Sequence, residues 1–118
     1  MIEIRPITTF ADMRAAEALQ TETWAMPPDE LTSAHTLHAL AHNGAALIGA
    51  YDDGRLIGMV LGVLATIPNP QRPDQPAAER LKMYSVMAGV HPAYQGQGIG
   101  RQLKLAQREF GLQLGIPL

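Results

Sequence analysis

Cysteine is absent from the 118-residue sequence, so disulfides, thiolate metal ligands and a cysteine nucleophile are all excluded. An excess of basic charge is absent as well, because nine basic residues stand against eleven acidic ones and give a net charge of −2. Proteins that bind nucleic acid usually carry a basic surface, so nucleic acid is not the expected partner. A local site for an anion remains compatible with this composition.

Long hydrophobic runs are also missing. Residues Met1 to Pro6 have neither the basic start nor the apolar run of a signal peptide. The longest apolar stretch, around Leu56 to Ile67, is interrupted by Gly58 and Gly62 and is too short to span a bilayer. We therefore expect a cytoplasmic protein without a membrane partner.

What the chain does contain is the composition of a globular protein, with 47% hydrophobic and 17% charged residues. Its length fits a single domain, expected to span residues 1–118 and to bury an apolar core. Prolines at four positions within residues 67–79 exclude a central strand or helix there. This segment is therefore expected to be a surface loop.

Apolar periodicity and turn residues predict an order of elements along the rest of the chain. Thr9 and Asp12 resemble a capping box at the start of a helix. Asp52-Asp53-Gly54 between two apolar runs is a strong hairpin signal. The expected elements are a strand over 2–6, helices over 11–24 and about 29–42, strands over 45–51, 55–66 and 81–90, the last of them buried, and a helix from residue 98. The order β-α-α-β-β-β-α is typical of an α+β fold with a mostly antiparallel sheet flanked by helices.

The last predicted helix carries two sets of apolar residues. One set recurs at three- and four-residue steps and is expected to face the core. Leu105 and Leu112 fall on the opposite face, where a fully solvated helix would not need them. The core-facing stripe consists of Ile99, Leu103, Ala106, Phe110 and Leu114.

The glycine-rich segment from Val90 to Arg101 lies between a predicted strand and this helix. A helix N-terminus presents unpaired N–H groups and a partial positive charge, which suit a phosphate or a pyrophosphate. Glycine at such a place lets the anion approach the backbone without meeting a Cβ atom. The segment therefore predicts an anion site.

Three phosphate-binding patterns compete for this segment. A P-loop requires Gly-Lys followed by Ser or Thr, whereas Gly100 is followed by Arg101 and Gln102. The dinucleotide fingerprint requires a glycine where Arg101 stands, and a parallel βαβ context that is missing. The third pattern, Gln-x-x-Gly-x-Gly, fits Gln95, Gly98 and Gly100.

With Val-His-Pro before it and the strand–turn–helix setting around it, this pattern resembles the acyl-CoA pyrophosphate motif of the GNAT superfamily of N-acyltransferases. The element order and the hairpin extend the resemblance over most of the chain. Further segments look like a branch of predicted acetyltransferases within this superfamily. They are Leu19-Gln20, Trp24, Leu47 to Tyr51, Met87 to Val90 and Leu103 to Arg108.

That branch often has Ser-His-Met in its central strand, where this chain has Ser85-Val86-Met87. The resemblance therefore assigns no role to a histidine at this place. It does imply an enzyme that transfers an acyl group, acetyl or similar, from acyl-CoA to a primary amine of a small molecule. Acetyl-CoA or another acyl-CoA would be the co-substrate, and no metal would take part.

By the same resemblance, particular backbone groups would hold the co-substrate. The backbone of Ala88 and Val90 would pair with the pantetheine arm, as an added strand pairs with the edge of a sheet. Gln95 belongs to the motif itself, and Arg101 adds a charge that is either near the phosphates or simply solvated. The N–H groups expected to bind the pyrophosphate are those of Gln97, Gly98, Gly100 and Arg101.

The residues that would exchange protons are not identified by the sequence. Tyr84 and Ser85 lie on the predicted central strand, and one of them is a candidate to contact the acceptor. His35 shares a helix face with His38 and His42, which either lines an acceptor pocket, ligates a metal or is solvated. Near the expected acceptor site lie Glu22, Trp24 and Glu30, although glutamates at such places are more often surface charges and a lone tryptophan is more often part of the core.

In the superfamily, a further strand and a helix follow the helix after the glycine turn. The chain ends where that strand is expected, so we predict a GNAT-like fold that lacks its C-terminal strand and helix. The alternative function is a non-catalytic CoA-binding or assembly module. An uncovered central strand beside Leu105 and Leu112 also predicts a homodimer, or association with the missing C-terminal portion.

Overall fold

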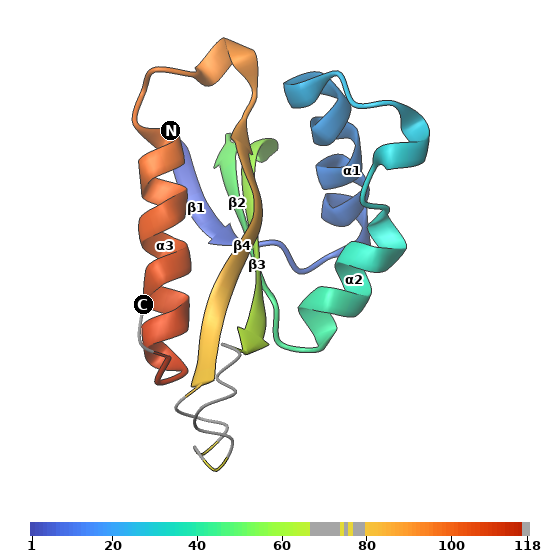
Figure 1. Cartoon of the computed structure of the whole chain (residues 1–118). Helices are drawn as coiled ribbons and strands as arrows, with labels where there is room; N and C mark the ends of the chain where they lie inside the picture. The colour runs from blue at the N-terminus through green and yellow to red at the C-terminus, as the bar shows by residue number, and fades with distance from the viewer. Residues whose placement is uncertain (67–73, 75, 77–79, 117–118) are drawn as a thin grey trace.

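Four antiparallel strands form one sheet in the order β1-β2-β3-β4 (Figure 1). The computed structural model describes residues 1–66, 74, 76 and 80–116, so most of the expected 67–79 loop lies outside the described residues. The strands are β1 (Ile2–Pro6), β2 (Ala46–Asp52), β3 (Arg55–Thr66) and β4 (Leu81–Val90). Because the order in the sheet follows the order in the chain, β1 and β4 are the two edges of the described sheet.

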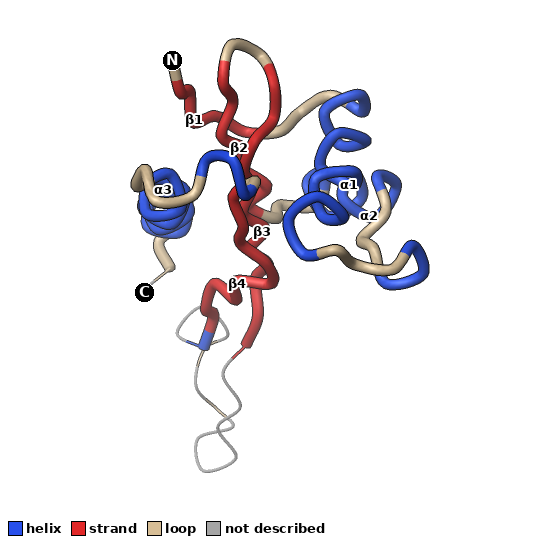
Figure 2. Tube along the Cα trace, turned by 90° about the horizontal axis from the view of Figure 1, so that it is seen from above, coloured by secondary structure: helices blue, strands red, loops and turns tan. Residues whose placement is uncertain are grey.

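Helices cover both faces of this sheet. Figure 2 shows α1 (Phe10–Trp24) and α2 (Ala34–His42) on one face and α3 (Ile99–Gln113) on the other. The three layers confirm the predicted α+β class, with an apolar core on each side of the sheet. The core under α1 and α2 includes Ile7, Met13, Leu19, Leu37, Tyr51, Met59 and Leu61. The core under α3 includes Ala46, Ile48, Ala50, Ile57, Val60, Ile99 and Leu103. No helix in the described part of the chain has the length and apolar character needed to cross a bilayer.

The β2–β3 hairpin turns at Asp53 and Gly54. Both residues adopt left-handed backbone angles, with φ values of 49° and 88°. Two consecutive residues with positive φ are typical of the tight turn that matches the twist of paired strands. The hairpin predicted from Asp52-Asp53-Gly54 is therefore confirmed.

The first helix begins as the sequence predicts, since the Thr9 side chain accepts a hydrogen bond from the backbone N–H of Asp12 at 3.1 Å. The second helix does not. Its expected start near Asp29 is wrong, because Pro28–Glu30 forms only a short 3-10 turn (η1) and the cap of α2 is Ser33.

A buried glutamine explains the late start of α2. The Gln20 side chain donates to the carbonyl of Thr32 and accepts from its N–H, both at 2.8 Å. A backbone whose N–H and C=O both bond one side-chain amide cannot continue a helical ladder. Helix α2 therefore begins only after this contact, and its predicted end at Asn43 and Gly44 is confirmed by the cap at Asn43.

The last strand differs from its prediction. It was expected to be central and buried, but within the described residues β4 pairs with β3 alone and its residues alternate between half-buried and exposed. Leu61 pairs with Met87 and Gly62 pairs with Ser85, so Val86 is an extra residue that forms a β-bulge. The apolar content of this segment predicted burial. A strand at the edge of the described sheet has a neighbouring strand on one side only, so its residues are less covered.

Helix α3 confirms most of its predicted stripe. Ile99 and Leu103 are buried, while Ala106 and Phe110 are half-buried. Leu114 is 53% exposed, because the helix ends at Gln113 and the stripe no longer applies beyond it. On the opposite face, Leu105 and Leu112 are exposed by 50% and 42%, as the spacing predicts.

Candidate functional site

The glycine-rich turn joins the end of β4 to the start of α3. A short 3-10 helix, η3 (Pro92–Tyr94), leads into it. Gly96 and Gly98 then adopt left-handed angles, with φ values of 82° and 79°, which L side chains rarely adopt. A Cβ atom at either glycine would have no neighbour within 4 Å. The turn therefore uses its glycines for backbone shape and leaves open space in front of them.

Several backbone N–H groups of this turn have no acceptor. The first bond of the helix runs from the Gln102 N–H to the Gly98 carbonyl at 3.2 Å, and no side chain caps the helix at Gly98. In the described part of the chain, the N–H groups of Gly98, Gly100 and Arg101 bond to no carbonyl or side chain. These donors lie at the positive end of a 15-residue helix, where an anion is stabilised. The structure thus brings together the residues expected to bind a pyrophosphate, with the exposed Gln97 beside them.

Gln95 has a supporting role in this turn. Its side-chain amide donates to the carbonyl of Val90 at 3.0 Å, which ties the beginning of the turn to the end of β4. Gly100, in the first turn of the helix, is also accessible, since an added Cβ would meet only Val90 Cγ2 at 3.9 Å. Space for a ligand is therefore left on the outer side of the turn.

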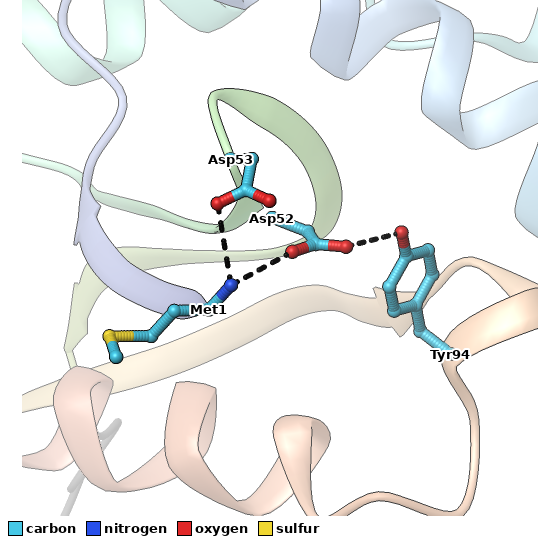
Figure 3. Close-up of polar contacts among 4 residues, drawn as sticks. All are labelled: Met1, Asp52, Asp53 and Tyr94. Carbon is cyan, nitrogen blue, oxygen red and sulfur yellow. Dashed lines mark hydrogen bonds and ion pairs between the residues drawn. The ribbon is translucent and has the colours of Figure 1, made fainter.

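A tyrosine and an aspartate hold the turn from one side, as Figure 3 shows. The Tyr94 hydroxyl donates to Asp52 Oδ2 at 2.7 Å, and the α-amino group of Met1 contacts Asp52 Oδ1 at 3.3 Å. The hydrogen bond from Tyr94, followed by that from the amino group, holds the pKa of Asp52 below its ordinary value. The same bond raises the pKa of Tyr94. The start of the glycine turn is therefore tied to the β2–β3 hairpin.

A histidine and a glutamate hold the turn from the side of α1. His91 Nε2 lies 3.1 Å from Glu22 Oε2, and His91 Nδ1 accepts the N–H of Ala93 at 3.1 Å. A neutral imidazole with its proton on Nε2 satisfies both contacts. Arg55 lies 3.8 Å from the same Glu22 oxygen. Glu22 thus supports the turn in this structure, which the sequence did not predict.

Trp24 also lies against β4. A Cβ atom at Gly89 would collide with the Trp24 ring, so only glycine allows this packing. The ring is 38% exposed, so it covers the strand and still faces solvent. Of the residues expected near the acceptor, Trp24 and Glu22 therefore lie beside the end of β4, whereas Glu30 is exposed in η1.

The free edge of β4 presents backbone groups next to the turn. The His91 N–H donates to the carbonyl of Ile57 at 2.7 Å, which fixes which residues of β4 bond to β3. In an antiparallel pair the bonded residues alternate, so Gly89 bonds toward β3 while Ala88 and Val90 direct their N–H and C=O groups to the free edge. The two residues expected to pair with a pantetheine arm therefore have outward backbone groups.

The three catalytic candidates lie in three different places. Ser85 faces α3, where its Oγ receives hydrogen bonds from Lys104 Nζ at 2.7 Å and Gln107 Nε2 at 3.4 Å. Tyr84 is 56% exposed and precedes Ser85 on the strand, so it points to the opposite face. His35 lies on α2 and packs its ring 5.2 Å from that of Phe10. The structure does not bring these three together.

The histidine face of α2 borders a separate pocket of about 480 Å³. His38 and His42 stack with ring centroids 5.7 Å apart. They line the pocket together with Ile4, Leu47 and Phe110, among others. Across the described residues, no group of three or more histidine, cysteine, aspartate or glutamate side chains could hold a metal ion.

Comparisons with known proteins agree with this fold. A sequence model described as the Acetyltransferase (GNAT) family matches residues 10–116. No curated protein matches the chain. The chain superimposes on the ribosomal-protein-S18-alanine N-acetyltransferase from Escherichia coli with a TM-score of 0.67 and 19% identity, covering 96% of this chain and 61% of that one.

Two other solved structures show the same fold. The PaiA N-acetyltransferase from Thermoplasma acidophilum, in complex with coenzyme A, has a TM-score of 0.71 at 19% identity, covering 98% of this chain and 75% of that one. An aminoglycoside acetyltransferase from an uncultured soil metagenomic sample has a TM-score of 0.79 at 18% identity, covering 98% and 73%. The chain thus spans 61% to 75% of the length of these three structures.

Proposed function

The chain belongs to the GNAT acetyltransferase family, and from this premise we propose that it transfers an acyl group from acyl-CoA to a primary amine of a small molecule. One observation carries the proposal: N–H groups at the start of α3, unpaired within the described residues, lie beside outward backbone groups on the edge of β4. The first set suits a pyrophosphate and the second suits an amide-containing arm. Coenzyme A has these two features in this order.

The residues that would hold the co-substrate follow from this arrangement. The N–H groups of Gln97, Gly98, Gly100 and Arg101 would bind the pyrophosphate at the positive end of α3. The outward backbone of Ala88, and the N–H of Val90, would bond the amides of the pantetheine arm. Open space in front of Gly98 and Gly100 supports this assignment, because the anion must approach the backbone closely.

The length of the arm indicates where the thioester would lie. Between its pyrophosphate and its sulfur, coenzyme A has about as many chain atoms as four residues of main chain, and an extended strand rises by about 3.3 Å per residue. An arm that starts beside Val90 would therefore end beside Val86. This is the bulged residue of β4, whose backbone does not pair with β3. A bulge beside a reactive group is a common way to leave backbone donors free for it.

Acyl transfer forms a C–N bond, breaks the C–S bond and requires a neutral amine and a proton for the departing thiolate. In the proposed arrangement this chain supplies orientation, because the turn and the strand edge hold the two ends of the co-substrate. The small-molecule acceptor is part of the proposal. Similar structures include enzymes named for ribosomal-protein alanine and for aminoglycosides, so the fold serves different amines.

A non-catalytic CoA-binding module is the second candidate. It is favoured by the placement of the catalytic candidates, since Ser85 bonds to two donors and Tyr84 faces the other way. Neither has a described partner that would accept its proton. Turnover of acyl-CoA with a panel of amines separates the enzyme from the binding module.

Binding of coenzyme A tests both candidates, and Gly100→Glu makes the test specific. A carboxylate in the first turn of α3 interacts favourably with the helix dipole. Glycine inside a helix destabilises it by about 0.5–1 kcal/mol, and its replacement removes this cost. We therefore expect unchanged or raised thermal stability together with a large loss of affinity for coenzyme A by calorimetry. Gln113→Glu at the other end of α3 is the control and is expected to bind normally. Absence of binding by the wild-type protein would remove the proposed function, and normal binding by Gly100→Glu would place the anion elsewhere.

A further inference from the structure

Three hydrogen-bond donors converge on the face of β4 that α3 covers. Lys104, in the second turn of α3, extends to Ser85 and places its Nζ 2.7 Å from the hydroxyl oxygen. Gln107, one turn later, directs its amide nitrogen to the same oxygen at 3.4 Å. Ser85 directly precedes the bulged residue Val86. A lysine, an amide and a hydroxyl therefore meet beside the bulge.

The charge of this cluster is not balanced. In the described ranges, no carboxylate lies within ion-pair distance of Lys104, although ion pairs there engage Arg5, Arg55, His91 and the amino terminus. Gln107 is only 6% exposed and is one of two buried polar residues among those described. Its amide is held in place because it packs on Gly62, where an added Cβ would lie 2.6 Å from its nitrogen. A fixed amide and a cation without a carboxylate partner in the described part of the chain form a site that suits a carboxylate.

The position of the cluster relates it to the proposed co-substrate. The pantetheine arm would reach Val86, and an acyl chain would continue along β4 in the same direction. A four-carbon dicarboxylic acyl group adds about one residue's length beyond its carbonyl. Its terminal carboxylate would then arrive at Ser85 and Lys104, whereas an acetyl methyl group would end before them.

We propose that Lys104, Ser85 and Gln107 recognise the terminal carboxylate of a dicarboxylic acyl group, so that the preferred donor is a short dicarboxylic acyl-CoA such as succinyl-CoA. This inference rests on the proposed function and adds the class of the acyl group. Lys104 supplies the charge, and the Ser85 hydroxyl and the Gln107 amide set the direction of the carboxylate. Because the acceptor does not enter the argument, the test uses binding rather than turnover.

Calorimetry with succinyl-CoA, acetyl-CoA and coenzyme A provides the measurement. A charged hydrogen bond contributes about 1.5–3 kcal/mol, which corresponds to roughly ten-fold or more in affinity. We expect the wild-type protein to bind succinyl-CoA roughly ten-fold more tightly than acetyl-CoA. Lys104→Met is expected to abolish this ratio, and Ser85→Ala to reduce it. The ratio cancels any general attraction between Lys104 and the phosphates, which all three compounds share.

Lys82 provides a matched control, since Lys82 and Lys104 are the only lysines in the sequence. Lys82 is exposed on β4 but lies three residues before Ser85, so Lys82→Met is expected to keep the ratio. Equal affinities of the wild-type protein for succinyl-CoA and acetyl-CoA would overturn the inference, and so would a ratio that survives Lys104→Met. Failure of the wild-type protein to bind any of the three compounds would instead overturn the proposed function. Thermal unfolding of each variant verifies that it folds.

Discussion

The junction between β4 and α3 and the outer face of α2 both present polar groups to solvent, but they are built differently. At the junction, backbone N–H groups are fixed by glycine angles and by side chains that reach the turn from two sides. On α2, His35 and His38 pack against Phe10 and His38 stacks with His42, beside a pocket of about 480 Å³. The fixed donors at the junction, which have no acceptor among the described residues, point more directly to a ligand than the pocket and the histidines do, because their desolvation requires an acceptor.

The largest expected difference between the two regions comes from one pair of glycine substitutions. Gly98 and Gly44 both have positive φ, 79° and 94°, and an added Cβ at either would have no neighbour within 4 Å. Gly98→Ala and Gly44→Ala should therefore cost similar stability, about 1–2 kcal/mol for the left-handed angle. Only Gly98→Ala is expected to abolish detectable binding of coenzyme A by calorimetry. Equal effects of the two variants on binding would mean that the junction has no special role.

A second prediction concerns association through α3. Leu105 and Leu112 form an exposed apolar pair on the outer face of the helix, and β4 is an edge of the described sheet. Such a surface favours contact with a second copy of the chain. We expect the wild-type protein to self-associate in light scattering and Leu105→Glu with Leu112→Glu to lower its average mass. Substitutions on the α2 face, such as His38→Ala, are expected to leave the mass unchanged. A monomeric wild-type protein at high concentration would contradict this prediction.

A smaller effect on the affinity for coenzyme A is expected when the tyrosine that holds the glycine turn is replaced. Tyr94 bonds to Asp52 at 2.7 Å, and elsewhere Tyr51 bonds to Asp12 at 3.1 Å, so the same chemical change can be made in both places. Tyr94→Phe should lower the affinity for coenzyme A several-fold, whereas Tyr51→Phe should lower stability without changing that affinity.

Pantetheine, which lacks the pyrophosphate, separates positioning from a general defect. Its weaker binding should not respond to Tyr94→Phe, because the turn does not contact it in the proposed arrangement. If Tyr94→Phe and Tyr51→Phe changed coenzyme A affinity alike, Tyr94 would have no positioning role.

The smallest predicted effect is a pH dependence at the same contact. The pKa of Asp52 is held below its ordinary value of 3.8, chiefly by the Tyr94 hydrogen bond. A carboxyl group whose pKa is lower in the folded protein contributes stability above its ordinary pKa, and this contribution is lost as pH falls through the folded value. We therefore expect Asp52→Asn to destabilise the protein at pH 6 and to have less effect below about pH 3.8. Thermal unfolding across this range measures the difference, and a constant difference would contradict the assignment.

Much of the fold follows from local sequence signals. The hairpin at Asp53-Gly54, the cap at Thr9 and the end of α2 at Asn43 are local events, because the residues that cause them lie within a few positions of one another. The expected start of α2 near Asp29 failed for the opposite reason. It depends on Gln20, whose bonds to Thr32 join residues 12 positions apart.

The same division applies to the site. The sequence could predict Gln95, Gly98 and Gly100 as candidates, because backbone shape and an N-terminal helix dipole depend on adjacent residues. The contacts of Tyr94 with Asp52 and of His91 with Glu22 have no local sequence signal. The first two residues are 42 positions apart, and the second two lie still further apart in the sequence.

The sequence by itself therefore determined the element order, the glycine turn and the family to which the chain belongs, because periodicity, caps and turn angles are properties of neighbouring residues. Only the tertiary structure decided that β4 is an edge strand of the described sheet, that its bulge falls at Val86, and that Lys104 meets Ser85. Those facts depend on which strand pairs with which and on how α3 crosses the sheet. Such long-range packing is selected by the burial of whole faces, and no single segment encodes it.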